Sequence, residues 1–255
     1  MNKKTIEIIT RDRKKNGLNK ILSLQNSILF SLLDGISPES IMLIKELGLN
    51  KYGNKILKEG ARFIDTNRYR IIKKLDERKN KVGFIGRLAK EKGIIEFVKA
   101  IPIVTKQRKD IEFLIVGSGN LSLWINKECE RLRIVNNTEI TRINWIEEEF
   151  LPEYLNDLKL IVLPTYSDAL PTIILESMAC GLPVLASPIG AVLSVIKDGE
   201  TGYILEENNP ECIAKNILKI LDTDCNKIVA NGINLIEDKY TYDAAVGRYE
   251  NMLKM

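Results

Sequence analysis

The chain has 255 residues, which is long for one domain and short for two full α/β domains. Its hydrophobic share of 45% is ordinary for a globular protein, and a formal net charge of +4 does not by itself indicate a nucleic-acid-binding protein. Histidine is absent, which excludes a Ser-His-Asp triad, a histidine-bound zinc ion and a histidine general base. Any chemistry must use carboxylates, lysines, backbone amides or the substrate itself.

Cysteine spacing and hydropathy indicate the compartment. The four cysteines show no CxxC spacing, and we interpret them as reduced thiols of a cytoplasmic protein. The polar N-terminus shows no signal peptide, and no apolar run approaches the roughly 20 residues that cross a bilayer.

The first part of the chain lacks a regular pattern. Residues 1–16 are basic and polar, and we interpret them as a solvated chain end, with a surface for anionic lipid or an acidic partner as the alternative. Helices are expected at 17–33 and 38–47, with a very short strand at 36–37 between them. Residues 50–80 are irregular, contain one strand candidate and are the most linker-like part of the chain.

Strands and helices then alternate regularly. The expected strands are 81–88, 111–117, 139–146, 158–164, 183–187 and 201–207. Helices are expected at 93–106, 120–132, 147–156, from 171 onward, and at 210–222, 225–238 and 241–254, with a helical turn at 191–196. This alternation with short connections predicts an α/β fold with a doubly wound parallel sheet over residues 80–238. Ligands of such sheets bind outside the carboxyl ends of the strands.

Candidate binding residues follow the first two of these strands. Gly86 and Arg87 end the first strand and Lys92 stands five positions after Arg87, an arrangement suited to holding a pyrophosphate. Two ordinary surface cations are the alternative. Gly117 and Gly119 after the second strand would let a phosphate or ribose approach the backbone, although an ordinary tight turn explains them equally well.

Two further residues concern the base and the class of ligand. Ile146 is expected to close the third strand near the carboxyl edge, where backbone groups could hydrogen-bond a nucleotide base. The dinucleotide fingerprint would need a third glycine where Ser122 stands, so a dinucleotide oxidoreductase is disfavoured.

The stretch 162–190 carries the most informative residues. A strand ends in a proline, a polar loop carries Asp168, and the helix that follows has Thr172 at its start and holds Glu176. Free amides at the helix start and the helix dipole favour a negatively charged ligand. Asp168 is explained equally well as a helix-capping acid. Glu176 lies on an otherwise apolar helix and needs a polar partner, for which the paired hydroxyls of a ribose are suited.

Taken in order, these motifs resemble the retaining GT-B glycosyltransferases of glycosyltransferase family 4, also called group 1. The resemblance covers residues 50–255 and is strongest over 81–207. The matching motifs are GRL at 86–88, EKG at 91–93, the glycine turn at 117–119, Asp168 and Glu176 with seven residues between them, AxGxPV at 179–184 and DGxTG at 198–202.

The resemblance implies the domain organisation. Residues 80–238 would be a Rossmann-like domain that binds the nucleotide-sugar donor, which is the C-terminal half of a GT-B fold. Residues 1–79 would be a short helical segment and linker, the remnant of the acceptor-binding domain. Residues 239–255 would form the return helix that packs back onto the N-terminal half.

The resemblance also implies roles for the site residues. Arg87 and Lys92 would bind the donor diphosphate and stabilise the leaving group, Asp168 would contact the donor sugar, and Glu176 would hold the ribose. Members of the family retain the anomeric configuration and usually need no metal, so we expect no cofactor and no metal. The donor that the resemblance implies is a UDP- or GDP-sugar. Backbone groups would complete the donor site at Gly86, Gly117, Gly119, Ile146, Ala169, Leu170 and Thr172.

Two departures from the family pattern bear on the activity. The first acid is usually Glu followed by Gly, whereas this chain has Asp168 and Ala169, which shortens the reach of the carboxylate and narrows the approach to the backbone. Only about 80 residues precede the donor domain, whereas a complete GT-B enzyme has a second domain that binds the acceptor and often supplies a histidine.

We therefore expect a glycosyltransferase that acts as the donor-binding half of an enzyme for glycan or lipid-linked acceptors. It would work with an acceptor-binding partner chain or as a homodimer. A catalytically inactive nucleotide-sugar-binding module and a truncated glycosyltransferase are the alternatives. Nucleic acid is not an expected partner, and the basic N-terminus is compatible with peripheral contact at the inner face of a membrane.

Overall fold

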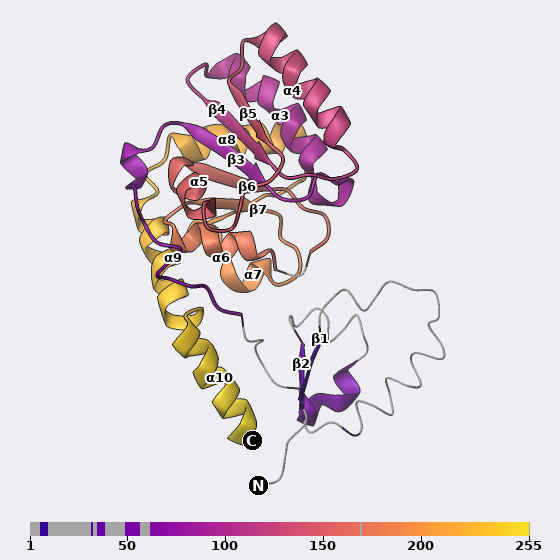
Figure 1. Cartoon of the computed structure of the whole chain (residues 1–255), viewed down its shortest axis with the longest axis vertical. Coiled ribbons are helices and arrows are strands. Elements are labelled where there is room, and N and C mark those ends of the chain that lie inside the picture. The colour runs from indigo at the N-terminus through magenta and orange to yellow at the C-terminus, as the bar shows by residue number, and fades with distance from the viewer. Residues whose placement is uncertain are drawn as a thin grey trace, which may run out of the picture.

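The computed structural model describes residues 6–9, 32, 35–38, 49–56, 62–168 and 170–254. In these ranges the chain forms a two-stranded parallel sheet near the N-terminus and a six-stranded sheet flanked by helices (Figure 1).

The larger sheet is parallel throughout, as expected, with the strand order β5-β4-β3-β6-β7-β8. Its strands are β3 (Lys81–Ile85), β4 (Glu112–Val116), β5 (Ile140–Ile143), β6 (Leu160–Leu163), β7 (Val184–Ala186) and β8 (Tyr203–Ile204). The chain builds outward from β3 to β5 and then returns to β6 to build the other half, which confirms a doubly wound fold. The order reverses between β3 and β6, so the loops that follow these two strands flank the crevice where ligands of such sheets bind.

Helices cover both faces of this sheet (Figure 1). One face carries α3 (Ile94–Gln107), α4 (Ser122–Asn136) and α8 (Pro210–Leu221), and the other carries α5 (Leu151–Asp157), α6 (Thr172–Ala179) and α7 (Val192–Val195), with α9 (Asn226–Lys239) packed on α6. Successive strand residues alternate between the two cores: Phe113 and Ile115 enter the first, Leu114 and Val116 the second. Burial on both faces explains why the strands read as continuous apolar runs.

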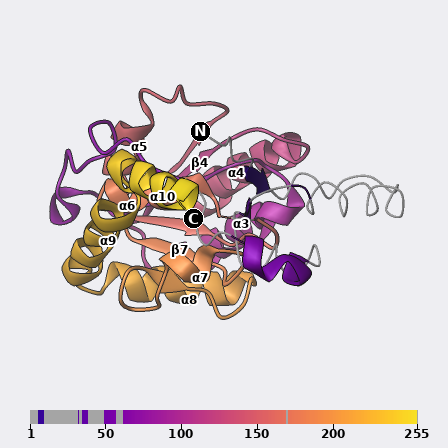
Figure 2. The same cartoon turned by 90° about the horizontal axis from the view of Figure 1, so that it is seen from below.

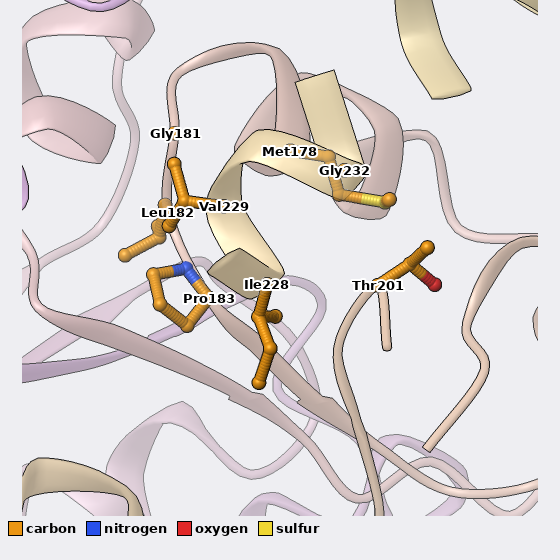
Figure 3. Close-up of a pocket in the computed structure, with 8 residues that line it drawn as sticks. All are labelled: Met178, Gly181, Leu182, Pro183, Thr201, Ile228, Val229 and Gly232. Carbon is orange, nitrogen blue, oxygen red and sulfur yellow. The ribbon is translucent and has the colours of Figure 1, made fainter. Parts of the chain in front are cut away.

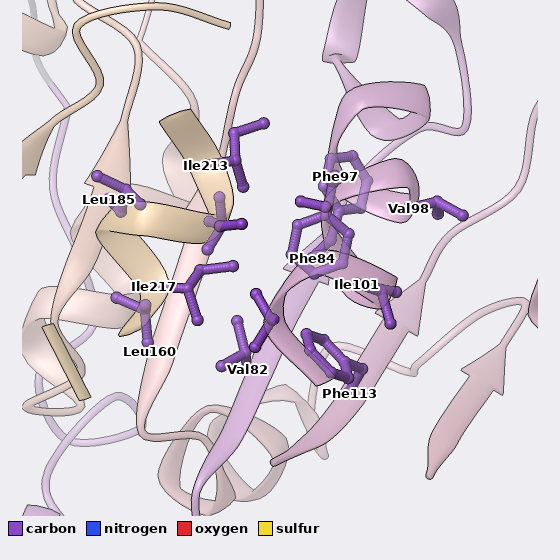
Figure 4. Close-up of a cluster of buried hydrophobic side chains, with 14 of the residues drawn as sticks. Val82, Phe84, Phe97, Val98, Ile101, Phe113, Leu160, Leu185, Ile213 and Ile217 are labelled. Atoms are coloured by element: carbon purple, nitrogen blue, oxygen red, sulfur yellow. The ribbon is translucent and has the colours of Figure 1, made fainter. Parts of the chain in front are cut away.

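Aromatic packing in the first core fixes the start of the domain (Figure 4). The ring centroids of Phe84 and Phe97 are 5.7 Å apart, and those of Phe97 and Phe113 are 6.2 Å apart. Burying a phenylalanine side chain contributes roughly 1.5–3 kcal/mol. The cluster therefore holds β3, α3 and β4 together and sets the position of the loop between β3 and α3.

The N-terminal segment contains more than helices. Strand β1 (Ile6–Ile9) pairs in parallel with β2 (Gly35–Pro38), and Ile36 also forms an isolated parallel bridge to Ile56. The short strand expected at 36–37 is thus confirmed, whereas the interpretation of residues 6–9 as part of a solvated end is wrong. The parallel partner of β1 lies far along the chain, and local composition does not reveal it. The helices expected at 17–33 and 38–47 lie outside the described residues, apart from Leu32, which is helical, and Pro38, which ends β2.

Residues 62–80 are irregular, as expected, with one short 3-10 helix, η3 (Leu75–Glu77), and no strand. They are nevertheless fixed to the sheet domain. The guanidinium of Arg78, which is 3% exposed, donates to the carbonyl oxygens of Leu155 (3.2 Å), Leu158 (3.0 Å) and Cys180 (2.7 Å). Burial lowers the pKa of Arg78 more than the nearby Cys180 and Asp157 raise it, so that the pKa is about 10.

The C-terminal helix α10 (Tyr242–Lys254) extends beyond the body of the domain (Figure 1), and seen from below it lies in front of the domain (Figure 2). At the start of α10, the segment that leaves the sheet domain contacts the segment that precedes it in the sequence. The amide of Ile64 donates to the Tyr240 carbonyl at 2.7 Å, and the Phe63 ring packs edge-on against Tyr242 with centroids 5.3 Å apart. Arg248 of α10 donates to the carbonyl oxygen of Arg62 at 2.8 Å. Residues 62–64 therefore lie beside the start of α10.

Two negative findings apply to the described ranges alone. None of the helices there combines the length and the apolar character needed to cross a bilayer. All four cysteines, Cys129, Cys180, Cys212 and Cys225, carry free thiols.

Candidate active site at the carboxyl edge of the sheet

The loop after β3 packs backbone against backbone on the loop after β6. Residues 90–92 form a 3-10 turn, η4 (Lys90–Lys92), which ends at Gly93 in the left-handed conformation with φ of 70°. A Cβ atom at Gly93 would stand 1.8 Å from the carbonyl oxygen of Pro164, so only glycine allows this approach. The carbonyl oxygen of Glu91 accepts from the amide of Tyr166 (2.9 Å) and the hydroxyl of Thr165 (3.0 Å). The two loops form one unit at the reversal point of the sheet.

Within this unit, Lys92 and Asp168 are in direct contact. The ammonium group of Lys92 forms an ion pair with Oδ2 of Asp168, and each side chain is 23% exposed. The N-cap of α6 is Pro171, and the Asp168 carboxylate is engaged by Lys92. Asp168 is therefore not the N-cap residue of α6, and its role as a site residue stays a prediction.

Arg87 takes a different position on the same loop. Its guanidinium forms an ion pair with Glu91 at 2.6 Å, and the Arg87 side chain is 57% exposed. An exposed pair of this kind contributes little to stability. Arg87 is thus a largely exposed side chain on the loop after β3, and its contact with an anionic ligand stays a prediction.

The glycine turn after β4 packs against the loop after β3. A Cβ atom at Gly117, where φ is 136°, would stand 1.8 Å from the carbonyl oxygen of Gly86, and one at Gly119 would stand 2.4 Å from that of Leu88. Hydrogen bonds from Leu88 to the Ser118 carbonyl (2.9 Å) and from Gly86 to the Val116 carbonyl (3.0 Å) close the contact. Packing alone explains these glycines, and a donor contact at them stays a prediction.

The remaining predicted backbone positions are distributed along this edge. Strand β5 ends at Ile143 rather than at residue 146, because its one neighbour, β4, ends at Val116, so Ile146 is a half-buried loop residue. The side chain of Leu170 is 6% exposed and belongs to the second core, and its carbonyl oxygen accepts from the guanidinium of Arg62, so a donor contact at Leu170 stays a prediction. Thr172 is exposed at the first position of α6. Ala169 lies outside the described residues.

Glu176 occupies a half-buried position on α6, one turn beyond Thr172. Burial raises the pKa of its carboxyl group to about 7, and the negative charge of Glu148 acts in the same direction, whereas the hydroxyl of Tyr69 opposes them. The carboxyl group therefore titrates near neutral pH. A perturbed acid at the ligand edge of such a sheet is a strong candidate for a binding contact.

Asn208 lies at the carboxyl edge of the sheet and is not among the residues predicted from the sequence. The side chain of Asn208 donates to the carbonyl oxygens of Pro164 (3.1 Å) and Thr165 (3.3 Å) and accepts from the hydroxyl of Ser187 (2.6 Å). It holds together the loops after β6, β7 and β8. Its place four residues after the last strand was the available signal, because that position falls at the carboxyl edge of the sheet.

One further surface feature of the described residues lies away from the candidate site. A shallow depression lies between the end of α6 and α9 and is lined by residues such as Met178, Pro183, Thr201 and Ile228 (Figure 3). It lies at the amino ends of β7 and β8, the edge opposite the candidate site, and has no interior room even for a water molecule. Across the described ranges, no three His, Cys, Asp or Glu side chains cluster so as to hold a metal ion.

Fold and motifs agree with the family match. The sequence profile described as "Glycosyl transferases group 1" matches residues 65–235, which is more than half of the chain. The chain belongs to the group 1 glycosyltransferase family.

Individual relatives are similar over the same region. The chain is 24% identical over 173 residues to the capsular polysaccharide biosynthesis glycosyltransferase CapM of Staphylococcus aureus, covering 67% of this chain and 45% of CapM. It is 28% identical over 164 residues to the alpha-D-kanosaminyltransferase of Streptomyces kanamyceticus, covering 64% of this chain and 42% of that enzyme. The chain thus spans less than half the length of these curated relatives.

Solved structures show the same fold. The C-terminal domain of the group 1 glycosyl transferase LpcC from Francisella tularensis matches with a TM-score of 0.61 and 24% identity, covering 70% of this chain and 98% of that domain. Anabaena Alr3699/HepE in complex with UDP matches with a TM-score of 0.80 and 13% identity, covering 98% of this chain and 72% of that protein. The six-stranded domain therefore has the fold of the C-terminal half of GT-B enzymes. The match to Alr3699/HepE covers more of the chain than this domain.

Proposed function

We propose that this chain binds a nucleoside diphosphate sugar at the carboxyl edge of the six-stranded sheet and serves as the donor-binding half of a glycosyltransferase. The contact between Lys92 and Asp168 carries the proposal. It brings a cation suited to a diphosphate next to an acid suited to sugar hydroxyls, at the reversal point of the sheet. The relative Alr3699/HepE, of the same fold, was solved in complex with UDP, which supports this choice of ligand.

The proposed site has a definite order along the edge. Lys92 and Arg87 hold the diphosphate, Asp168 contacts the sugar, and Glu176 accepts hydrogen bonds from the ribose. The amides at the start of α6 add donors, and the dipole of this helix favours negative charge. As the sugar leaves, negative charge grows on the diphosphate, and fixed cations and amides stabilise it without rearrangement.

The acceptor is bound elsewhere. We propose a glycan or lipid-linked acceptor, transfer with retention of the anomeric configuration, and an acceptor-binding region supplied by a partner chain, a second copy or the other half of the enzyme. The polysaccharide relative CapM supports a glycan acceptor. A cytoplasmic location, with contact to the inner face of a membrane, fits such acceptors.

Calorimetric titration with UDP, GDP and their sugar conjugates tests donor binding. We expect one nucleotide class to bind, and Arg87→Ala and Glu176→Ala each to weaken it at least tenfold. Arg131→Ala is the matched control: Arg131 is also an exposed arginine, 50% against 57%, and is also paired with an acid in its own segment, Glu128 at 2.5 Å. Equal weakening by Arg131→Ala, or unchanged binding in both site variants, would exclude this site.

Transfer is tested separately from binding. The chain is mixed with candidate acceptors and with proteins that co-purify with it, and the anomeric configuration of any product is read by NMR. We expect a product of retained configuration. Donor binding without transfer under all these conditions would limit the function to a nucleotide-sugar-binding module.

A further inference from the structure

Tyr69 belongs to the irregular segment that precedes the sheet, and its position there is fixed from both sides. Its amide donates to the Asp65 carbonyl at 2.8 Å. Before it, the amide of Ile64 donates to the Tyr240 carbonyl at 2.7 Å, and after it the amide of Ile72 donates to Oδ1 of Asn156 at 2.8 Å. The side chain therefore has little freedom to leave the domain.

The Tyr69 hydroxyl is a buried polar group beside the candidate site. The residue is 4% exposed and belongs to the second core, as do Ala179 and Cys180, while its buried hydroxyl has no hydrogen-bond partner. Burial raises the pKa of Tyr69 above its usual range, and Glu176 raises it most among the charged neighbours. A buried hydroxyl without a hydrogen-bond partner costs roughly 1–3 kcal/mol in stability. A hydrogen bond from the Tyr69 hydroxyl to a nearby acceptor is therefore favourable.

The same segment also controls the charges around Glu176. Arg68, adjacent to Tyr69, forms an ion pair at 2.5 Å with Glu148, the acid whose charge disfavours ionisation of Glu176. The thiol of Cys180 also lies near Glu176, and burial raises its pKa to about 12, so it stays neutral. The hydroxyl of Tyr69 lowers the pKa of Glu176, and Arg68 pairs with the acid that raises it, so both residues favour the ionised form of Glu176.

We propose that Tyr69 is a positioning residue of the nucleotide site, whose hydroxyl donates to the Glu176 carboxylate and holds it ready to accept the two ribose hydroxyls. This inference rests on the proposed function of Glu176. It also makes the segment at 62–80, which precedes the sheet, part of the donor site. The Glu176 oxygens have enough lone pairs to accept from Tyr69 and from a ribose together.

The test compares UDP with 2′,3′-dideoxy-UDP, or the guanine pair if the wild type prefers GDP, on the full chain and its Tyr69→Phe variant. Both ligands carry the same diphosphate, so its titration cancels in the ratio of their dissociation constants. We expect Tyr69→Phe to weaken UDP binding about fivefold to tenfold at pH 7 and to leave the dideoxy ligand within about twofold. The loss should shrink at pH 8.5, where Glu176 is ionised without help from Tyr69.

A second variant checks the same mechanism through a surface residue. Arg68 is 40% exposed, and Arg68→Met should also weaken UDP selectively at pH 7, because Glu148 is then unpaired beside Glu176. Equal weakening of both ligands by Tyr69→Phe, or no weakening, would show that Tyr69 acts only in packing. If the wild type binds UDP but not the dideoxy ligand and Tyr69→Phe changes neither, the proposed function survives and this inference fails. Absence of nucleotide binding by the wild type would overturn both.

Discussion

Lys92 and Asp168 form an ion pair across the loops that follow β3 and β6, at the point where the strand order of the sheet reverses. Both side chains are mostly buried, so the pair is less screened by solvent than the exposed pair of Arg87 and Glu91. In the proposed donor site, Lys92 faces the diphosphate and Asp168 the sugar. The pair therefore stands beside the bond that transfer would break.

This relationship predicts opposite effects of two substitutions on UDP, which has no sugar. Lys92→Met removes a charged contact to the diphosphate and should weaken binding by about 10- to 100-fold, corresponding to roughly 1.5–3 kcal/mol. Asp168→Asn removes a negative charge near the diphosphate, so UDP should bind as tightly as to the wild type or more tightly. Titration calorimetry at low and moderate salt measures both.

Lys81→Met provides the control for this experiment. Lys81 is likewise a mostly buried lysine, 17% exposed, paired with Asp157 at 2.5 Å, but it begins β3 at the opposite edge of the sheet. Its removal should leave UDP binding unchanged. If Lys81→Met and Lys92→Met weaken UDP equally, the loss comes from stability and not from a phosphate contact.

Local periodicity was enough to predict most of the fold. The six strands and their helices were foreseen because apolar runs such as Phe113–Val116 differ from the 3.6-residue pattern of helices such as α3. Strand ends were placed too far out, as at Ile146, because the end of an edge strand depends on where its neighbour stops. Strand β1 was missed because its partner β2 is distant in sequence.

The site was predictable only in part. Asp168, Lys92 and Glu176 were recognised because their spacing matches a family motif, and the structure brings the first two into contact. Tyr69 gave no signal, since its role depends on a tertiary approach to α6 from an irregular segment. For Gly117 the sequence left a phosphate contact and an ordinary tight turn equally open. The carbonyl oxygen of Gly86 fills the space that a side chain would need, which explains the glycine by packing, and a phosphate contact there stays a prediction.

Gly117→Ala tests whether packing requires this glycine. The new Cβ atom would stand 1.8 Å from the carbonyl oxygen of Gly86, in a backbone conformation that disfavours side chains. The loops after β3 and β4 must then separate, so we expect a loss of roughly 1–3 kcal/mol in the free energy of unfolding in urea. Gly247→Ala is the control, because it lies in α10 with open space around it and should stabilise the chain by up to about 1 kcal/mol. Destabilisation by both variants, or by neither, contradicts this explanation.

Arg78→Met tests how firmly the segment before the sheet is attached. Arg78 satisfies carbonyl oxygens at the ends of α5 and α6, and methionine would leave them buried without donors. We expect a loss of about 3–5 kcal/mol in unfolding free energy and faster proteolysis within residues 62–80. In the exposed control Arg131→Met the urea midpoint should not move. A wild-type proteolysis pattern in Arg78→Met would mean that other contacts, such as those of Asn156, hold the segment alone.

Glu176→Gln should stabilise the unliganded chain while it removes the ribose contact. The folded pKa of Glu176, about 7, lies above the ordinary value of 4.5, so the contribution of this one group to stability is fully present below pH 4.5 and is lost as pH rises through about 7. The shift corresponds to roughly 2–3 kcal/mol. The difference in unfolding free energy between Glu176→Gln and the wild type should therefore grow by that amount from pH 4.5 to pH 8, measured by urea unfolding at each pH. A difference that is independent of pH would show that the pKa of the carboxyl group is the same in the folded and the unfolded chain. An ionised Glu176 would then not destabilise the chain in the absence of a ligand.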